Sequence, residues 1–198
     1  EGEEWHRQGM RAEKQNVFDD FIYAAQYLIT HGWSTSDQLA IEGGSNGGLL
    51  VGAALTQRPD LFAAVVCSAP LLDMVRYELH GLGATWSDEY GSAVIEEEFE
   101  WLIGYSPYHQ VFEGEEYPAT LFTVFDGDTR VDPLHARKMC AALQYGQSAE
   151  SERPILIRAE RNVGHGARSL TRTIDLSADS LAFLSRWTGM STDGGAGS

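Results

Sequence analysis

Residues 39–48 have the sequence Leu-Ala-Ile-Glu-Gly-Gly-Ser-Asn-Gly-Gly, and this segment is the one that best indicates the fold. Leu39–Ile41 predicts a short buried strand, and the apolar run from Leu49 to Gln57 predicts a helix that ends before Pro59. A glycine-rich turn with Ser45 at its centre therefore joins a strand to a helix. Gly-x-Ser-x-Gly in this setting is typical of a nucleophile elbow, a strained turn that exposes a serine hydroxyl at the end of a sheet.

Two other interpretations of the glycine-rich turn stay open on its residues alone. A phosphate-binding loop is disfavoured, because no Lys follows as in a P-loop and Gly-x-Gly-x-x-Gly is absent. A structural turn without chemistry is the second alternative. If the elbow is correct, the helix that follows Ser45 offers the backbone N–H of Asn46 to an oxyanion.

The rest of the chain alternates between strand and helix patterns, which predicts an α/β domain with a mainly parallel sheet. Apolar spacing predicts an amphipathic helix from Asn16 to His31, with Asn16 as its N-cap and Gly32 as its stop. Further strands are predicted at 63–67, 120–125 and 155–157, and further helices at 137–145 and 171–187. From Leu71 to Pro118 the pattern weakens, as expected for a helical excursion that shapes a substrate pocket.

Composition limits the function classes. The 198 residues carry 14 Lys+Arg and 29 Asp+Glu, a formal net charge of −15, which argues against nucleic acid or an anionic membrane as a partner. No run approaches the roughly 20 apolar residues of a membrane helix. Two Lys against twelve Arg, with Glu96 to Glu98 expected on the surface, fit either a salt-adapted protein or an ordinary acidic one. We expect one domain over residues 1–190 and a disordered tail over 191–198.

The two cysteines, Cys67 and Cys140, lie in apolar stretches and predict buried free thiols. They form no disulfide framework and no metal-ligand spacing, and we expect neither metal nor cofactor. No signal peptide pattern opens the sequence, which favours a cytoplasmic protein. The chain begins with Glu1 instead of Met, which predicts a processed or incomplete piece.

A serine nucleophile requires a base and an orienting acid, in the chain order serine, acid, histidine for this type of fold. His165 is the candidate base, because it lies between glycines in the loop after the predicted strand at 155–157. Three candidate acids follow the strand that ends at Phe125, and spacing does not choose among them: Asp126, Asp128 and Asp132. The other histidines are expected at the surface, at helix ends or too near these acids: His6, His31, His80, His109 and His135.

Several segments resemble the peptidase domain of the prolyl oligopeptidase family. The resemblance extends from Glu3 to about Trp187, nearly the whole chain, and the segment Gly-Gly-Ser-Asn-Gly-Gly-Leu-Leu is its most specific part. The other matching segments are 14–21, 57–62, 105–108 and 128–131. The resemblance implies an α/β-hydrolase fold without its first strands, and hydrolysis of short peptides on the carboxyl side of proline.

The resemblance also implies roles for individual residues. Ser45 would be the nucleophile, Asp128 the orienting acid and His165 the base, with the Asn46 N–H as one oxyanion donor. Trp86 would stack on the substrate proline, in a pocket lined by Tyr90, Val131 and Leu71. Arg130 would donate to a substrate carbonyl.

The residues alone leave structural alternatives without a binding role for Trp86 and Arg130. For Trp86 the residues alone favour a core aromatic, and for Arg130 a surface ion pair with Asp126 or Asp132 stays open. Flat aromatic contact does suit a rigid pyrrolidine that offers no N–H once acylated.

In the family, a tyrosine upstream of Glu1 supplies the second oxyanion donor, and a propeller domain limits substrate size. The resemblance implies that these parts and the first strands are partners of this chain, which alone would be weakly active. The alternatives are a serine hydrolase of other specificity (an acylaminoacyl peptidase, an oligopeptidase B-like enzyme or an esterase) or a catalytically impaired fragment.

Overall fold

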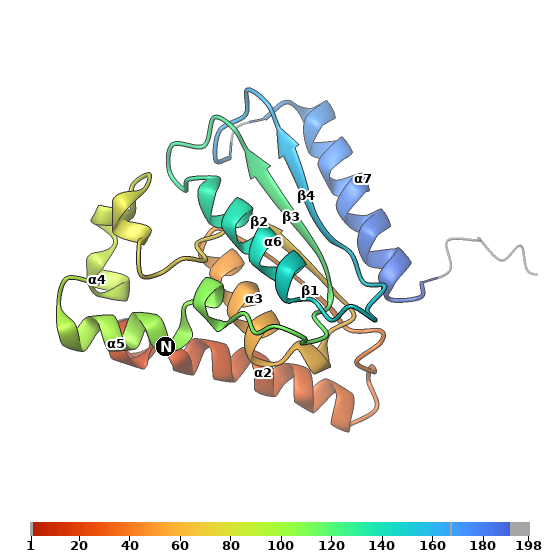
Figure 1. Cartoon of the computed structure of the whole chain (residues 1–198), viewed down its shortest axis with the longest axis horizontal. Helices are drawn as coiled ribbons and strands as arrows, with labels where there is room; N and C mark the ends of the chain where they lie inside the picture. The colour runs from red at the N-terminus through yellow and green to blue at the C-terminus, as the bar shows by residue number, and fades with distance from the viewer. Residues whose placement is uncertain (1, 167, 191–198) are drawn as a thin grey trace, which may run out of the picture.

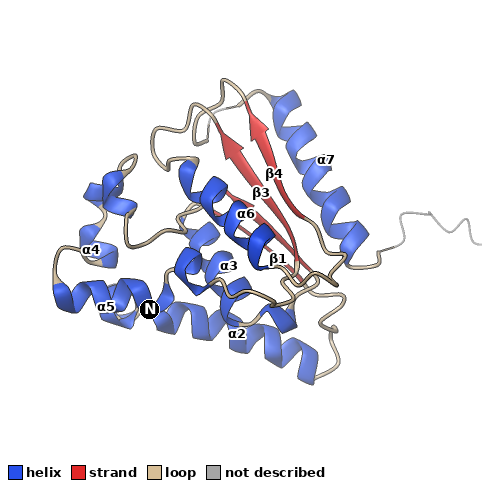
Figure 2. Cartoon of the chain, in the orientation of Figure 1, coloured by secondary structure: helices blue, strands red, loops and turns tan. Residues whose placement is uncertain are grey.

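Four parallel strands form the central sheet, in the order β1-β2-β3-β4 (Figures 1 and 2). The computed structural model describes residues 2–166 and 168–190. The strands are β1 (Ala40–Gly44), β2 (Ala64–Ser68), β3 (Ala119–Phe125) and β4 (Ile155–Glu160). Their register pairs Gly44 with Ser68 and Ser68 with Thr123, so the carboxyl ends of neighbouring strands lie at one edge. The predicted parallel α/β architecture is confirmed.

Helices cover both faces of the sheet. They are α1 (Gly2–Arg7), α2 (Gln15–Thr30), α3 (Asn46–Gln57), α4 (Ser87–Tyr90), α5 (Glu96–Tyr105), α6 (Leu134–Gly146) and α7 (Leu170–Trp187). Phe122 and Val124 of β3 belong to the core cluster that contains side chains of α2, α3 and α6, whereas Phe125 packs with Leu176 of α7. Because strand side chains alternate between faces, α7 lies on the opposite side of the sheet from α3 and α6.

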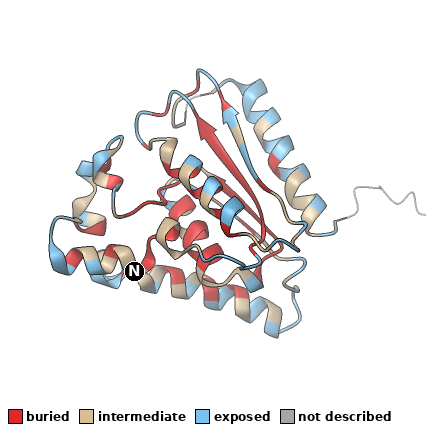
Figure 3. Ribbon diagram, in the orientation of Figure 1, coloured by how far each residue is buried: buried red, intermediate tan, exposed pale blue. Residues whose placement is uncertain are grey.

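Burial differs sharply between β3 and β4, the strands that precede the candidate acid and the candidate base. All seven residues of β3 are buried, as Figure 3 shows, and continuous burial of this kind is typical of a strand covered on both faces. In β4 only Ile155 and Glu160 are buried, and Leu156 and Ile157 are exposed. β3 is therefore a fully buried inner strand, and β4 is a less covered edge strand.

The predicted N-cap of the first long helix is wrong. α2 begins at Gln15, and Asn16 lies inside its first turn, where the side-chain amide donates to Gln8 O over 2.9 Å. A 3₁₀ turn at Arg11–Glu13 leads directly into the helix, so the chain is already helical before Asn16. Gly32 follows the end of α2 with a φ of +72°, as expected for a C-terminal glycine stop.

The excursion between Leu71 and Pro118 is helical, as predicted, and consists of α4, α5 and several 3₁₀ turns. One expectation for this region fails: Glu98 is buried and pairs with Arg11, whereas Glu96 and Glu97 are exposed as expected. Glu98 also accepts the backbone N–H of Ser92. This carboxylate therefore ties the excursion to the N-terminal segment and is not part of a solvated acidic surface.

Both cysteines are buried free thiols, as predicted. Desolvation raises the pKa of the Cys67 thiol well above its usual value, which makes this group unreactive. None of the helices in residues 2–166 and 168–190 combines the length and apolar character needed to cross a membrane. The predicted tail over 191–198 lies outside the described residues.

Candidate active site

Ser45 lies in a strained turn between β1 and α3. Its φ and ψ are 57° and −118°, and its backbone N–H donates to Ser68 O over 2.9 Å. A Cβ on Gly43 would lie 2.1 Å from Gly47 O, so only glycine fits at that position. A Cβ on Gly48 would lie 2.7 Å from Pro70 Cβ. Strain at one non-glycine residue, enforced by close backbone contacts, is the geometry expected of a nucleophile elbow.

His165 links Ser45 to Asp128 through its two ring nitrogens. His165 Nε2 is 3.2 Å from Ser45 Oγ, and His165 Nδ1 is 2.7 Å from Asp128 Oδ2. If the Nδ1–H donates to the carboxylate, Nε2 accepts the serine hydroxyl proton. The three residues come from the loops that follow β1, β3 and β4, at the carboxyl ends of the strands.

Backbone geometry distinguishes Asp128 from the other two candidate acids. The Asp128 side chain is 1% exposed, and its Oδ1 accepts the backbone N–H groups of Arg130 and Val131 over 2.9 and 3.0 Å. Asp126 is exposed and pairs with Arg137 over 3.0 Å. The Oδ1 of Asp132 accepts the N–H of Leu134, the first residue of α6, over 2.9 Å. Of the three acids, Asp128 is the one that contacts His165.

The remaining histidines have other surroundings. His135 is buried, and its Nδ1 accepts the backbone N–H groups of Asp73 and Leu72 over 3.1 and 3.4 Å. Desolvation lowers the pKa of His135 to about 4, so this imidazole is neutral at physiological pH. His6 and His31 are exposed, and His80 and His109 are half-buried.

The four residues expected to form a proline pocket lie together. Leu71, Tyr90 and Val131 belong to one buried hydrophobic cluster, and the half-buried Trp86 packs against it. The cluster connects the excursion to the Asp128 loop and to α3, which begins at the serine turn. An apolar cluster with one aromatic ring partly open to solvent can accept a small apolar group.

Arg130 is exposed, and within residues 2–166 and 168–190 it forms no ion pair. The alternative expectation, an ion pair with Asp126 or Asp132, is therefore wrong. Asp126 pairs with Arg137, and Asp132 has His80 at 3.9 Å. The Arg130 guanidinium remains available to a ligand.

Sequence reasoning missed several residues beside Ser45. A hollow of about 180 Å³ lies next to the serine and is lined by Gly44, Ser45, Ser68, Ala69, Phe125, His165, Gly166 and Arg168. Arg168 stacks over the Phe125 ring, with its guanidinium carbon 4.2 Å from the ring centroid. Ser68, Ala69 and Phe125 end predicted strands or directly follow them, and this position in a parallel sheet is the signal that could have found them.

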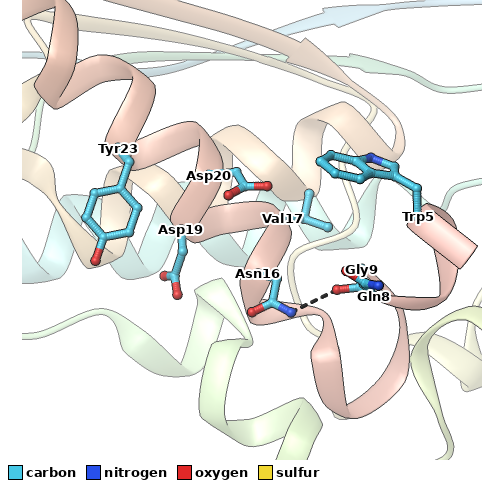
Figure 4. Close-up of a pocket in the computed structure, with 8 residues that line it drawn as sticks. All are labelled: Trp5, Gln8, Gly9, Asn16, Val17, Asp19, Asp20 and Tyr23. Atoms are coloured by element: carbon cyan, nitrogen blue, oxygen red, sulfur yellow. Dashed lines mark hydrogen bonds between the residues drawn. The ribbon is translucent and has the colours of Figure 1, made fainter. Parts of the chain in front are cut away.

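A second hollow, of about 420 Å³, lies over α1 and α2 (Figure 4). Its lining residues are Trp5, Gln8, Gly9, Asn16, Val17, Asp19, Asp20 and Tyr23. This set includes none of the residues predicted to act in catalysis or substrate binding. The larger hollow is therefore not the candidate active site.

Comparisons with known proteins place these observations in a family. Residues 1–191 match the prolyl oligopeptidase family. The chain is 45% identical over 184 residues to prolyl endopeptidase of Elizabethkingia miricola and 42% identical over 187 residues to that of Dictyostelium discoideum. These alignments cover 92% and 93% of this chain but only 26% and 25% of the relatives. The chain thus spans about a quarter of the length of the curated relatives it matches.

Solved structures agree with the sequence comparison. A chain from a study of two prolyl endopeptidases superposes with a TM-score of 0.91 at 50% identity, covering 94% of this chain and 28% of that one. Prolyl oligopeptidase B from Galerina marginata, bound to a 35-residue hydrolysis and macrocyclization substrate, superposes with a TM-score of 0.89 at 38% identity, covering 95% and 27%. The fold is that of an α/β hydrolase, and the chain belongs to the prolyl oligopeptidase family.

Proposed function

We propose that this chain carries the catalytic triad of a serine peptidase that hydrolyses short peptides on the carboxyl side of proline. The observation that carries the proposal is the hydrogen-bonded row from Ser45 through His165 to Asp128, beside the apolar cluster with the half-exposed Trp86. Membership of the family supports the same reaction, since relatives carry the name prolyl endopeptidase.

In the proposed reaction, Ser45 Oγ attacks the carbonyl carbon of the proline residue, and its proton passes to His165 Nε2. The C–N bond then breaks, His165 returns the proton to the leaving amine, and an acyl-enzyme remains. Water then attacks the ester carbonyl carbon and gives a proton to His165 Nε2, and His165 passes this proton to Ser45 Oγ as the ester bond breaks. Asp128 holds the imidazole in the tautomer with a proton on Nδ1 and stabilises the imidazolium that forms.

The developing oxyanion is stabilised in this proposal by the backbone N–H of Asn46. Asn46 is the first residue of α3, and the N–H groups of a first helical turn have no partner within the helix. The helix dipole adds to this donor. A second donor and the limits on substrate size are assigned to the part of the relatives that the chain does not span.

Proline selectivity is assigned to Trp86, Tyr90, Leu71 and Val131. Arg130 is assigned the role of donating a hydrogen bond to a substrate carbonyl. A pyrrolidine ring offers shape and apolar area but no amide N–H, so a flat aromatic wall is the selective contact. Solved structures of the Galerina marginata enzyme with a serine, an aspartate or a histidine changed to alanine, each bound to a substrate, support assigning these residue types to the chemistry.

The test uses the full-length protein as encoded, with residues numbered as here. A fluorophosphonate probe should label the parent protein at Ser45, and Ser45→Ala should abolish the labelling. A panel of prolyl, arginyl and acyl-ester substrates then measures specificity. Preference for the arginyl or ester substrate would replace prolyl specificity by a related hydrolase activity. Absence of labelling in the parent would indicate an inactive member of the family.

A further inference from the structure

The hydroxyl of Tyr90 connects the candidate proline pocket to the candidate oxyanion donor. It donates to the side-chain Oδ1 of Asn46 over 2.9 Å. Tyr90 is the last residue of α4, the one-turn helix that begins after Trp86, and Asn46 is the first residue of α3. The pocket wall is therefore directly bonded to the residue whose backbone N–H is assigned to the oxyanion.

Tyr90 is fixed from its own side. It is 4% exposed, and its ring meets Tyr77 edge to face, with centroids 5.5 Å apart. The buried Lys14 ammonium lies 5.1 Å from the ring centroid and pairs with Glu89 over 2.8 Å, which holds α4 against the N-terminal segment. Burial raises the pKa of the Tyr90 hydroxyl above its usual value, so the hydroxyl keeps its proton at neutral pH and remains a donor.

The Asn46 side chain is much less constrained than that of Tyr90. The residue is exposed, and within residues 2–166 and 168–190 its side chain makes one hydrogen bond, to Tyr90. The Asn46 N–H belongs to the peptide plane that joins Asn46 to Ser45, and Ser45 has a strained backbone with a φ of 57°. A donor stabilises an oxyanion only when it is already aimed at the position where charge develops. The bond from Tyr90 adds a side-chain restraint to the residue that carries this donor.

We propose that Tyr90 is a positioning residue for catalysis, which holds the Asn46 backbone N–H toward the oxyanion through the Asn46 side chain. This inference rests on the proposed function, because it takes Asn46 as an oxyanion donor.

The test is Tyr90→Phe in the full-length protein as encoded, assayed with a prolyl-aminocoumarin substrate. Phe keeps the ring and the pocket wall, so KM should change by less than about twofold. We expect kcat to fall about 5- to 30-fold, equivalent to about 1–2 kcal/mol in the activation barrier. A peptide ending in prolinal forms a tetrahedral adduct with an oxygen in the oxyanion site, so its affinity should fall by a similar factor. The matching carboxylic acid product should bind unchanged.

Two further variants separate positioning from general packing. Asn46→Ala removes the same bond from its other end and keeps the backbone N–H, so it should lower kcat comparably, and the double variant should add little to either single loss. Tyr77→Phe is the matched control, because the Tyr77 hydroxyl is also buried in this aromatic cluster but donates to Gly91 O. It should lower the melting temperature and leave kcat within about twofold.

The inference is overturned if Tyr90→Phe retains the parent kcat while Ser45→Ala is inactive, and in that case the proposed function stands. It is also overturned if Tyr77→Phe loses as much kcat as Tyr90→Phe, because the effect is then loosened packing. A Ser45→Ala variant that retains turnover is a different result. It overturns the proposed function, and the positioning role falls with it.

Discussion

Changing Asp128 to Asn tests the triad with the smallest alteration of the loop. The Asp128 Oδ1 accepts two backbone N–H groups, from Arg130 and Val131, and the carbonyl oxygen of an Asn can accept both. The Oδ2 position then becomes an NH₂ group facing His165 Nδ1, now 2.7 Å away. An amide donor at that site requires Nδ1 to be the acceptor, which moves the ring proton to Nε2 and leaves the Ser45 hydroxyl without a base.

The expected loss is large because the wrong tautomer disables the base in nearly every molecule. In a triad of this kind the corresponding change lowers kcat by about 10⁴-fold, or about 5 kcal/mol at 1.36 kcal/mol per factor of ten. The loop hydrogen bonds survive, so the melting temperature should change by only a few degrees. A large kinetic loss with a small stability loss is the signature that separates an orienting acid from a structural one.

Two neighbouring aspartates provide matched controls for the assay. Asp126→Asn breaks an exposed ion pair with Arg137, an interaction typically worth about 1 kcal/mol or less, and should leave kcat/KM within about twofold. Asp132→Asn keeps an oxygen that can accept the N–H of Leu134 and should be similarly mild. All three variants are compared by steady-state hydrolysis of a prolyl-aminocoumarin substrate and by thermal melts. The reasoning is refuted if Asp126→Asn loses more activity than Asp128→Asn, or if Asp128→Asn stays within tenfold of the parent.

Ser45→Ala and His165→Ala should each remove nearly all turnover and by similar factors, since triad members act as a unit, and more than about a tenth of the activity left in either variant contradicts the assignment. Burial lowers the pKa of His135 to about 4, against 6.5 in the unfolded chain, so between pH 4 and 6.5 the unfolded state binds more protons than the folded state. The free energy of unfolding should therefore fall by up to about 3 kcal/mol as the pH is lowered from 6.5 toward 4, which urea denaturation at each pH measures. His135→Asn should abolish this contribution to the pH dependence. If the charge of −15 reflects salt adaptation, the melting midpoint should rise between about 0.1 and 2 M salt, whereas a flat or falling midpoint rules it out. The 198-residue chain alone should turn over about 10²–10³ times more slowly than a version extended upstream, because a second oxyanion donor is expected there; equal turnover, with light scattering showing monomers in both, contradicts this.

The sheet could be predicted closely because its strands are buried on both faces or bounded by turn residues. The strand predicted at 120–125 is observed at Ala119–Phe125. The sequence predicts that the helix after the serine turn begins at Leu49, because the glycines at positions 47 and 48 weaken local helix propensity. The helix in fact begins at Asn46. Glycine is nevertheless required at position 48, since a Cβ there would lie 2.7 Å from Pro70 Cβ.

The site was predictable only as far as residue types and strand ends allow. Spacing placed three acids near His165, but choosing Asp128 without the family resemblance requires knowing which carboxylate the turn directs inward. Glu98 was expected in water, because a run of three glutamates gives no sign that one of them meets Arg11. The bond from Tyr90 to Asn46 spans 44 positions and depends on how the excursion folds back over α3.

The proposed triad and the Trp86–Tyr90 side of the proposed pocket are held by different parts of the fold, and this has a consequence for their sensitivity to mutation. Ser45, Asp128 and His165 each follow a strand of the parallel sheet. If one strand shifted by one residue along its neighbour, its loop would move by about 3.3 Å, which is more than the 3.2 Å between His165 Nε2 and Ser45 Oγ and would break that contact. The Trp86 and Tyr90 turn depends instead on the Lys14–Glu89 pair and on its hydrophobic cluster. Loosening the excursion should therefore change KM and proline selectivity before it disturbs the hydrogen bonds of the triad, and the Tyr90 hydroxyl is the point where such loosening would first reach the chemistry.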